Sequence, residues 1–286
     1  MSKLLKAFAS GGNVRVYITN TTDITNDAII AHDLYPSAAS VLGKTMTIAL
    51  MMGSMMKGEE ALTIKINGNG PIGNVIVDSN AKGTVRGYVD NPHVHFSRGG
   101  KLDDITTLGY NGYYDIIKDL KLKDLYSSTI AIQTGDLAKD FTYYFAASEQ
   151  TPSLVALAST INEDNTAKVT GGVIIQLMPG ASETDIVAIE EKMGLLENLS
   201  DLLLKHKNLE DILALICSDY QVLEEIEVKF YCPCSWEGFY NAIKSIGKEG
   251  ILHLLENEEN SEVVCHYCNT RYEYTHKDLN KLLEDL

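Results

Sequence analysis

Two cysteine-bearing stretches, FYCPCSWEGF at residues 230–239 and VVCHYCNTRY at residues 263–272, decide how the end of this chain folds. They contain four of the chain's five cysteines: Cys232, Cys234, Cys265 and Cys268. The first two form a C-x-C pair and the last two a C-x-x-C pair, and thirty residues separate Cys234 from Cys265. Two close cysteine pairs at such a distance are typical of a structural zinc site, because each pair supplies two thiolates to one tetrahedron. We therefore predict that these four cysteines bind one Zn²⁺.

The tail that holds these cysteines, residues 230–286, is short for an independent domain. Chains of this size bury little apolar surface and often depend on a metal or disulfides. A structural zinc ion contributes about 10–16 kcal/mol in small domains that are unfolded without it, against about 5–15 kcal/mol for the stability of a whole domain. Loss of the metal is therefore expected to unfold the tail. His266 lies inside the second pair, and with His253 and His276 it is a weaker candidate ligand.

Thiolates are also the form of cysteine that oxidants attack, so the same cluster has two functional interpretations. One is an inert zinc ribbon, and the other is a redox switch in which oxidation to disulfides releases the metal. Spacing alone favours the ribbon. The unusual C-x-C half and the charge of the preceding segment favour the switch. Cys217, the fifth cysteine, is expected to be a buried structural residue.

Composition limits the partners and the compartment. The chain has 286 residues and a formal net charge of −15, which argues against nucleic acid as a partner, because phosphate contacts need clustered Lys and Arg. The amino-terminal residues lack the apolar run of a signal peptide, so we expect a cytoplasmic protein. Residues 37–56 are apolar enough to require a membrane check. Because they contain Lys44 and several small polar residues, a buried helix is the better interpretation, with no membrane partner.

The pattern along the chain predicts an α+β fold with three parts. Residues 1–180 mix a long helix around Pro36–Gly58, alternating strands such as ALTIKI, NVIVD and GTVRGYVD, and a helix that breaks at Pro152 before a further strand. They predict an α/β domain with largely antiparallel sheets. Residues 181–229 predict a helical linker, and residues 230–286 a small zinc-binding domain.

The predicted linker combines short helices with dense negative charge. Residues 181–229 hold 4 basic and 12 acidic side chains, a net charge of −8. Ser182 with Asp185 resembles a capping box, and Asn208 can cap the next helix. Such short helices are marginal in water and need a surface to pack on. We expect charge repulsion to oppose this packing, so that changing Glu190, Glu191, Glu224 and Glu225 to Gln should raise the oxidation needed to open the linker.

Two short motifs resemble those of enzyme classes. ASVLGKT at residues 39–45 ends like a nucleotide-binding loop, but Ala38 stands where the motif needs glycine and Pro36 begins a helix there. A thiol–disulfide oxidoreductase would place its C-x-x-C at the start of a helix in a βαβ unit. Residues 262–274 instead predict a strand, a turn and a strand. We therefore predict that the chain is not an enzyme.

Five ordered blocks resemble one family. They are NGNGPIG (67–73), YYFAASEQTPS (143–153), GGVIIQLMPGA (171–181), VKFYCPCS (228–235) and VCHYCNTRYEY (264–274). With the cysteine spacing, they make the chain resemble the redox-regulated holdase chaperones of the heat shock protein 33 family, also called thirty-three-kilodalton chaperonins. His266 is a local variation between two cysteines and leaves the implied ligands unchanged.

The resemblance implies a stress-response chaperone that works without ATP. In the reduced state, Cys232, Cys234, Cys265 and Cys268 would hold one Zn²⁺ per chain and the protein would be inactive. Oxidants would form the disulfides Cys232–Cys234 and Cys265–Cys268 and release the metal. The tail and linker would then unfold, homodimers would be favoured, and unfolding client proteins would be bound on apolar surface beneath and within residues 181–229.

Overall fold

The structure is a computed structural model that describes residues 2–257, 260–284 and 286. The chain divides into two compact units, one ending at Tyr231 and the other beginning at Cys232. Each is described by itself. The sequence also predicts boundaries at residues 180 and 229, between a core domain, a linker and a tail. These boundaries describe which parts fold independently, and they stay a prediction.

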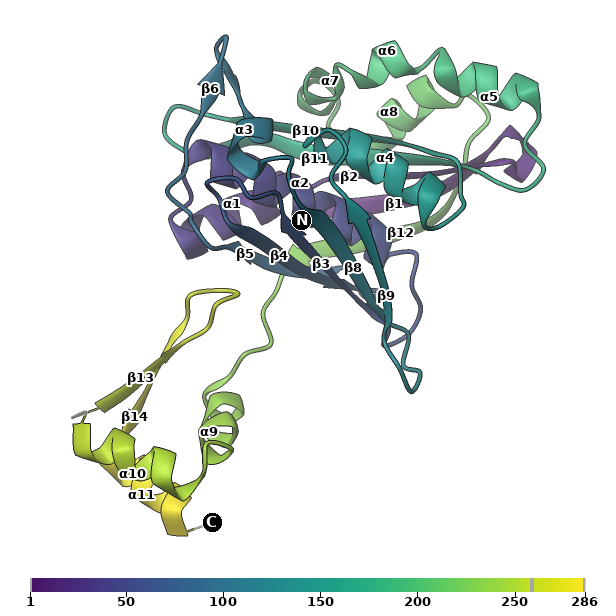
Figure 1. The fold of residues 1–286 in the computed structure, drawn as a ribbon. Helices are drawn as coiled ribbons and strands as arrows, with labels where there is room; N and C mark the ends of the chain where they lie inside the picture. The colour runs from purple at the N-terminus through teal and green to yellow at the C-terminus, as the bar shows by residue number, and fades with distance from the viewer. Residues whose placement is uncertain (1, 258–259, 285) are drawn as a thin grey trace. The chain divides into compact units, whose positions relative to one another are not determined.

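A ten-stranded sheet forms the frame of the first unit (Figure 1). Its strands, in spatial order, are β10 (Ser153–Ile161), β11 (Ala167–Leu177), β2 (Val14–Asn20), β1 (Ser2–Ala9), β12 (Gln221–Phe230), β5 (Thr84–Val89), β4 (Asn74–Asn80), β3 (Ala61–Asn67), β8 (Tyr113–Asp119) and β9 (Tyr126–Ala131). All neighbours pair antiparallel except β12 and β5, which are parallel. The prediction of a mixed fold with largely antiparallel sheets is therefore confirmed.

Helix α2 (Pro36–Gly53) lies between the two halves of this sheet (Figure 1). Pro36 at its first turn has the backbone angle that a helix start needs. Sixteen of its 18 residues are buried, because it packs against β10 and β11 on one side and β3, β4 and β5 on the other. This confirms a buried core helix for residues 37–56, although it ends at Gly53, before the expected Gly58. Met46 and Met51 are fully buried in its core. In the described part of the chain, no helix meets the length and apolarity that a membrane span requires.

Further helices complete the core around α2. They are α1 (Thr22–His32) and α4 (Leu137–Ala147), with the short α3 (Asp104–Leu108) and the small β6 (Ser97–Arg98) and β7 (Lys101–Leu102) hairpin nearby; Ser10–Gly12 form a 3₁₀ turn. Asp136 caps α4 by accepting hydrogen bonds from the backbone of Ala138 and Lys139. Buried Asp140 in α4 accepts from the Tyr114 hydroxyl and from the backbone of Gly135. These contacts hold β8, the turn before α4 and α4 itself together.

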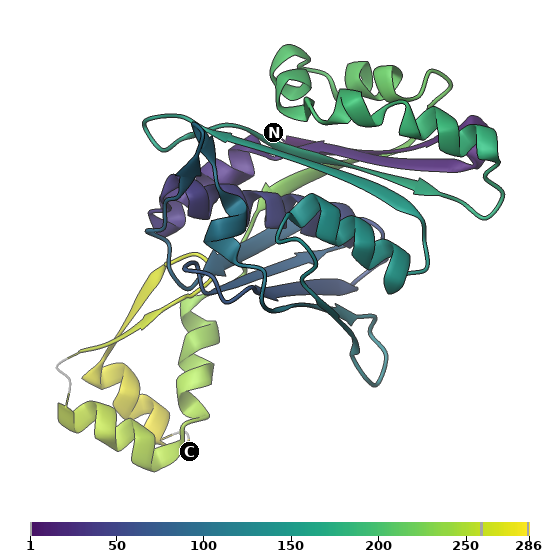
Figure 2. The same ribbon diagram turned by 45° about the horizontal axis from the view of Figure 1, so that its top comes forward.

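The segment after β11 forms four short helices that cover the outer face of β11, β2 and β1 (Figure 2). They are α5 (Glu183–Glu190), α6 (Met193–Leu196), α7 (Leu199–Lys205) and α8 (Leu209–Ile216). The Ser182–Asp185 capping box and the Asn208 cap are both present. Leu199, Leu203, Ile212, Leu213 and Ile216 are buried on the sheet, whereas Leu215 is 42% exposed.

The helical prediction is wrong beyond α8. Residues Gln221–Glu225 were included in the predicted helical linker, but they begin β12 in the middle of the sheet. Val222, Ile226 and Phe230 recur every four residues and so mimic a helix, while Ile226, Val228 and Phe230 alternate as a strand does. Pairing with β1 decides between the two patterns.

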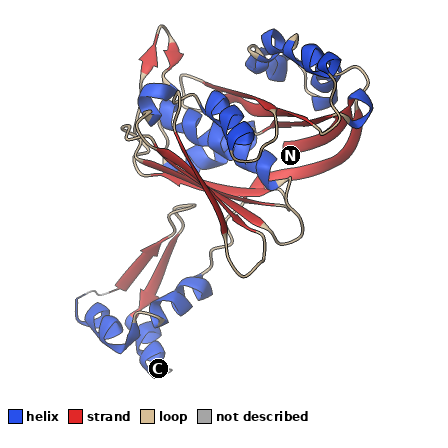
Figure 3. Ribbon diagram, turned by 45° about the vertical axis from the view of Figure 1, so that its right-hand side comes forward, coloured by secondary structure: helices blue, strands red, loops and turns tan. Residues whose placement is uncertain are grey.

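Helices and a β-hairpin make up the described residues of the second unit (Figure 3). They are α9 (Trp236–Lys244), α10 (Gly247–Asn257), β13 (Asn260–Val264), β14 (Arg271–Thr275) and α11 (His276–Glu284). Its small core contains Ile243, Ile251, Tyr274, Leu279 and Leu282. Trp236 stacks on Tyr240 at 4.8 Å between ring centroids, and its indole donates to Glu273 O at 3.0 Å.

Candidate metal centre

The four predicted cysteines come from two separate segments of the second unit. Cys232 and Cys234 lie in the extended stretch before α9, where the Ser235 hydroxyl caps the helix by accepting from Gly238 N at 3.0 Å. Cys265 and Cys268 lie in the turn between β13 and β14. The Ser235 cap fixes the backbone directly after Cys234, and the β13–β14 hairpin fixes the backbone of Cys265 and Cys268.

The β13–β14 turn directs both of its thiols to one side. Cys265 O accepts backbone hydrogen bonds from Cys268 N at 3.4 Å and Asn269 N at 2.8 Å, and Cys265 N donates to Thr270 O at 3.0 Å. Asn269 takes a left-handed conformation with φ of 54°, which asparagine tolerates better than most residues. The predicted strand–turn–strand is confirmed, so Cys265 does not begin a helix as it would in a βαβ oxidoreductase.

The structure brings all four thiols together. Their Sγ atoms lie within 4.8 Å of one another. The two closest contacts cross between the pairs, with 3.7 Å from Cys232 to Cys265 and 3.4 Å from Cys234 to Cys268. Cys265 is buried and the other three are half-buried. This arrangement positions the four cysteines to hold a metal ion.

Two neighbouring hydroxyls contact the cluster. The Tyr272 hydroxyl lies 3.2 Å from Cys234 Sγ, and the Thr270 hydroxyl lies 3.2 Å from Cys268 Sγ. Neither Thr270 nor Tyr272 is among the residues predicted from the sequence. Thr270 and Tyr272 stand two and four positions after Cys268, and the alternation of a strand puts such residues on one side. That periodicity was the signal available for finding them.

Without a metal the thiols differ in acidity. Burial raises the pKa of Cys234 to about 12, against the opposing effect of the Tyr272 hydroxyl. Burial also acts to raise the pKa of Cys268, but hydrogen bonds from the Thr270 side chain and backbone outweigh it and lower this pKa to about 7. Cys268 can therefore form a thiolate near neutral pH. Four thiolates together need a cation to offset their charge.

The hydrophobic core of the unit supports the cluster from one side. The Tyr274 side chain is fully buried, and its hydroxyl donates to Trp236 O at 2.8 Å. This bond joins β14, which follows the second cysteine pair, to α9, which follows the first. The cysteines are thus held by one helix start and one hairpin that share a single small core.

The remaining candidates lie elsewhere. His266, His253 and His276 are not among the side chains that form this metal-competent group in the described residues. Cys217 is buried beside α8 in the first unit, where burial raises the pKa of its thiol to about 11. Lys44 lies inside α2 and pairs with Asp104 at 2.7 Å, so the residues 39–45 form no phosphate-binding loop.

Comparison with known proteins agrees with this geometry. A family model described as Hsp33 protein matches residues 2–275. The curated 33 kDa chaperonin of Bacillus velezensis is 44% identical over 288 residues, covering 100% of this chain and 99% of that protein. The 33 kDa chaperonin of Staphylococcus aureus is 43% identical over 287 residues, covering 99% and 98%.

A solved structure shows the same fold. The crystal structure of the 33 kDa chaperonin (heat shock protein 33 homolog) of Thermotoga maritima superposes with a TM-score of 0.91 at 31% sequence identity. The match covers 99% of this chain and 98% of that one. The similarity therefore extends over both compact units.

Proposed function

The chain belongs to the Hsp33 family, and on this basis we propose that it is a redox-regulated, ATP-independent holdase chaperone that protects unfolding proteins during oxidative stress. The observation that carries the proposal is the convergence of four Sγ atoms within 4.8 Å from two distant segments. That geometry couples the oxidation state of the thiols to the folding of the tail.

The donor set fits zinc. Four cysteine sulfurs are the ligand set of structural Zn²⁺ sites, and softer thiolates disfavour Mg²⁺ or Ca²⁺. We propose that Cys232, Cys234, Cys265 and Cys268 hold one Zn²⁺ per chain in the reduced protein. When bound, the ion cross-links the start of α9 to the β13–β14 turn. The five-residue buried core of the tail is small for 55 residues, so this cross-link supplies much of the stability.

Oxidation removes these donors in pairs. We propose disulfides Cys232–Cys234 and Cys265–Cys268. Each forms when a peroxide accepts two electrons from two thiols and is reduced to two water molecules or to water and an alcohol. Such disulfides close very short loops and so constrain the unfolded chain little. The tail therefore loses the zinc cross-link, and the two disulfides restore almost none of its stability.

Unfolding of the tail is proposed to spread to residues 181–229. The helices α5–α8 are short, and the apolar surface beneath them includes Leu5, Val16 and Ile175. Exposure of this surface and of the helices' own apolar faces supplies a platform for unfolding client proteins. The same exposure favours a homodimer of the oxidised protein. In this scheme residues 1–180 are the stable core, 181–229 the metastable linker and 230–286 the switch, and the protein works in the cytoplasm.

Two other functions make different predictions. A thiol–disulfide oxidoreductase would turn over a disulfide substrate, and an inert zinc ribbon would keep its metal and its fold under mild peroxide. The hairpin position of Cys265 disfavours the first. We propose that the chain is not an enzyme.

The deciding experiment measures zinc content and client aggregation in the same sample. Full-length reduced protein is treated with hydrogen peroxide at elevated temperature, and bound zinc, free thiols and the aggregation of a thermally unfolding model enzyme are followed together. We expect stoichiometric zinc loss to coincide with suppressed aggregation, and dithiothreitol to reverse both. Suppression that is equally strong before oxidation, or zinc loss without any suppression, would contradict the proposed function.

A further inference from the structure

Strand β12 joins two otherwise separate half-sheets. Without it, the order of strands divides into β10-β11-β2-β1 and β5-β4-β3-β8-β9. It also comes last in the first unit, and one residue, Tyr231, separates its end from Cys232. Any event that unfolds the chain from the cysteine cluster backwards therefore reaches β12 first.

We propose that β12 is a displaceable strand, and that the edge of β1 which it vacates binds extended segments of unfolding client polypeptides by strand addition. The inference rests on the proposed function, in that oxidation starts the displacement. It adds a defined docking site and a mode of recognition, main-chain hydrogen bonding, to the general apolar platform.

The main-chain pairing of β12 is unequal on its two sides. With β1 it runs antiparallel from Ser2↔Val228 to Phe8↔Gln221, with an irregularity after Lys6. With β5 the register covers the pairs Lys229↔Thr84 and Phe230↔Val85 alone. The edge that β12 leaves on β1 is thus nearly a full strand long, whereas the edge on β5 is short.

The side chains of β12 are less buried than those of β1. Val228 is the one buried residue in the strand, Val222, Ile226 and Phe230 are half-buried against the two cores, and Leu223 is 50% exposed. By contrast, Leu4, Leu5 and Ala7 of β1 are all buried, because α2 and α5–α8 cover its two faces. A strand held by backbone pairing and only a few partly buried side chains lies toward the low-stability end of local unfolding. β1 can therefore stay in place while β12 leaves.

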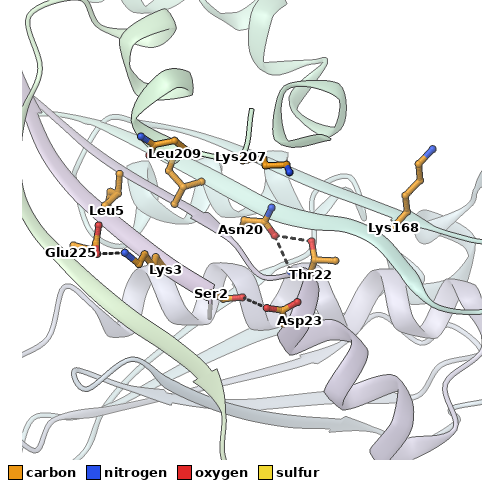
Figure 4. Close-up of a pocket in the computed structure, with 11 residues that line it drawn as sticks. Ser2, Lys3, Leu5, Asn20, Thr22, Asp23, Lys168, Lys207, Leu209 and Glu225 are labelled. Atoms are coloured by element: carbon orange, nitrogen blue, oxygen red, sulfur yellow. Dashed lines mark hydrogen bonds and ion pairs between the residues drawn. The ribbon is translucent and has the colours of Figure 1, made fainter. Parts of the chain in front are cut away.

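Two exposed ion pairs fasten β12 to β1. Lys3 Nζ lies 2.5 Å from Glu225 Oε1 and Lys6 Nζ lies 2.7 Å from Glu224 Oε2. Figure 4 shows the Lys3–Glu225 pair at one end of an open pocket of about 650 Å³ between β1, β2 and the loop before α8. Exposed pairs of this kind contribute little to stability and weaken with salt. The pocket leaves this end of the β1–β12 pairing open to solvent.

The vacated edge fits a client segment better than a specific partner. An unpaired strand edge offers N–H and C=O groups that any extended chain can pair with. The native occupant fills it with one buried and three half-buried apolar side chains, so the slot favours apolar residues without demanding a particular sequence. Lys3 and Lys6 add a preference for acidic residues at two positions. Recognition through the backbone suits a chaperone whose clients share no sequence.

The test uses a fluorescent peptide with the β12 sequence QVLEEIEVKF as a surrogate strand. Its control carries N-methyl groups on the residues whose N–H groups point to β1, which removes donors and keeps every side chain. Anisotropy measures binding to full-length reduced and oxidised protein, and hydrogen exchange follows residues 2–9. We expect the unmodified peptide to bind the oxidised protein at least about tenfold more tightly than the reduced protein, and to reduce its suppression of client aggregation.

The outcomes separate this proposal from the function on which it rests. Protection of residues 2–9 that persists after oxidation, or peptide binding without competition against the client, would overturn the docking site while leaving a holdase intact. Protection that appears in oxidised dimers alone would assign the edge to β12 of a second copy and would also overturn it. Oxidised protein that holds no client would refute the holdase function, while anisotropy and exchange would still report whether the edge opens.

Discussion

The thiol of Cys234 lies 3.4 Å from that of Cys268, although 33 residues separate the two in the chain. The closest sulfur contacts thus cross between the C-x-C and C-x-x-C pairs. The disulfides that we propose form within the pairs. The shortest sulfur contacts in the folded cluster and proximity along the chain therefore favour different products.

Disulfide mapping distinguishes these products. We expect Cys232–Cys234 and Cys265–Cys268 in the oxidised protein, because closure within a pair remains possible after the tail unfolds, whereas closure across pairs needs the folded cluster. Trypsin cuts after Lys229, Lys244, Lys248 and Arg271, so each pair falls on its own peptide. Mass spectrometry should find two unlinked peptides, each about 2 Da lighter than its reduced form. One cross-linked species would contradict the proposed pairing.

Removal of the metal under reducing conditions should unfold the second unit, since the zinc cross-link supplies much of its stability. Trp236 is the chain's single tryptophan and packs in the small core of that unit, so its fluorescence reports on this unit selectively. A zinc chelator with dithiothreitol should shift its emission to the red, since the tail loses a contribution of about 10–16 kcal/mol. Zinc added back should restore the spectrum. An unchanged emission at full zinc loss would remove the trigger from the mechanism.

Cys217 should react only when α8 leaves the sheet. Burial, with a smaller effect of Asp219, raises the pKa of this thiol from 9.0 to about 11, so little thiolate exists at pH 8. Iodoacetamide should leave Cys217 unlabelled in the reduced, zinc-loaded protein and label it after oxidation. Cys217→Ser should leave zinc binding and activation unchanged. Labelling of Cys217 before oxidation would show that α8 is already open.

The same thiol makes stability depend on alkaline pH. The unfolded chain releases the proton near pH 9, whereas the folded state retains it to about pH 11. The contribution of this site is therefore fully present below pH 9 and is lost as the pH rises from 9 to 11. Urea unfolding of the wild type and Cys217→Ala across this range should show a steeper decline for the wild type. Parallel declines would assign the pH dependence to other groups.

The substitution Gly83→Ala should loosen β12 while leaving the sequence of β12 unchanged. Gly83 has φ of +78°, and a Cβ there would lie 2.4 Å from Glu227 O and 2.8 Å from Ile226 Cγ2. Gly58→Ala is the matched control, because Gly58 also has a positive φ of +56° but nothing within 4 Å of the added atom. Hydrogen exchange of residues 221–230 in reduced protein should rise about tenfold or more in Gly83→Ala, and activation should need less peroxide. Equal effects of the two variants would mean that backbone strain alone is responsible.

The charge hypothesis for the linker needs a correction at two of its four residues. Glu224 and Glu225 pair with Lys6 and Lys3, so their charges attract β12 to β1 instead of repelling it. We now expect Glu224→Gln with Glu225→Gln to lower the peroxide needed for activation slightly. Glu190→Gln with Glu191→Gln still tests repulsion and should raise it. Peroxide titrations of the two double variants that move in the same direction would reject this division.

The cysteine cluster could be predicted from the sequence because its geometry depends on short local motifs. A C-x-x-C turn and a capped helix start each need only a few neighbouring residues, here Asn269 and Ser235. The place of β12 could not be predicted in this way, because residues 221–230 satisfy the helix and strand periods equally well. Their structure is decided by pairing with β1, more than 200 residues earlier. Strands β1, β2 and β8 were not identified either, although their burial patterns alternate in part.

The central position of β12 also affects how the protein is made. Ribosomes extend a chain at about 5–20 residues per second, so about 3–10 s pass between the end of β11 at Leu177 and the end of β12 at Phe230. During this interval the nascent chain holds both half-sheets with their inner edges unpaired. Each newly synthesised molecule therefore passes through a stage in which it is itself prone to aggregate, and slower translation after residue 177 would prolong it.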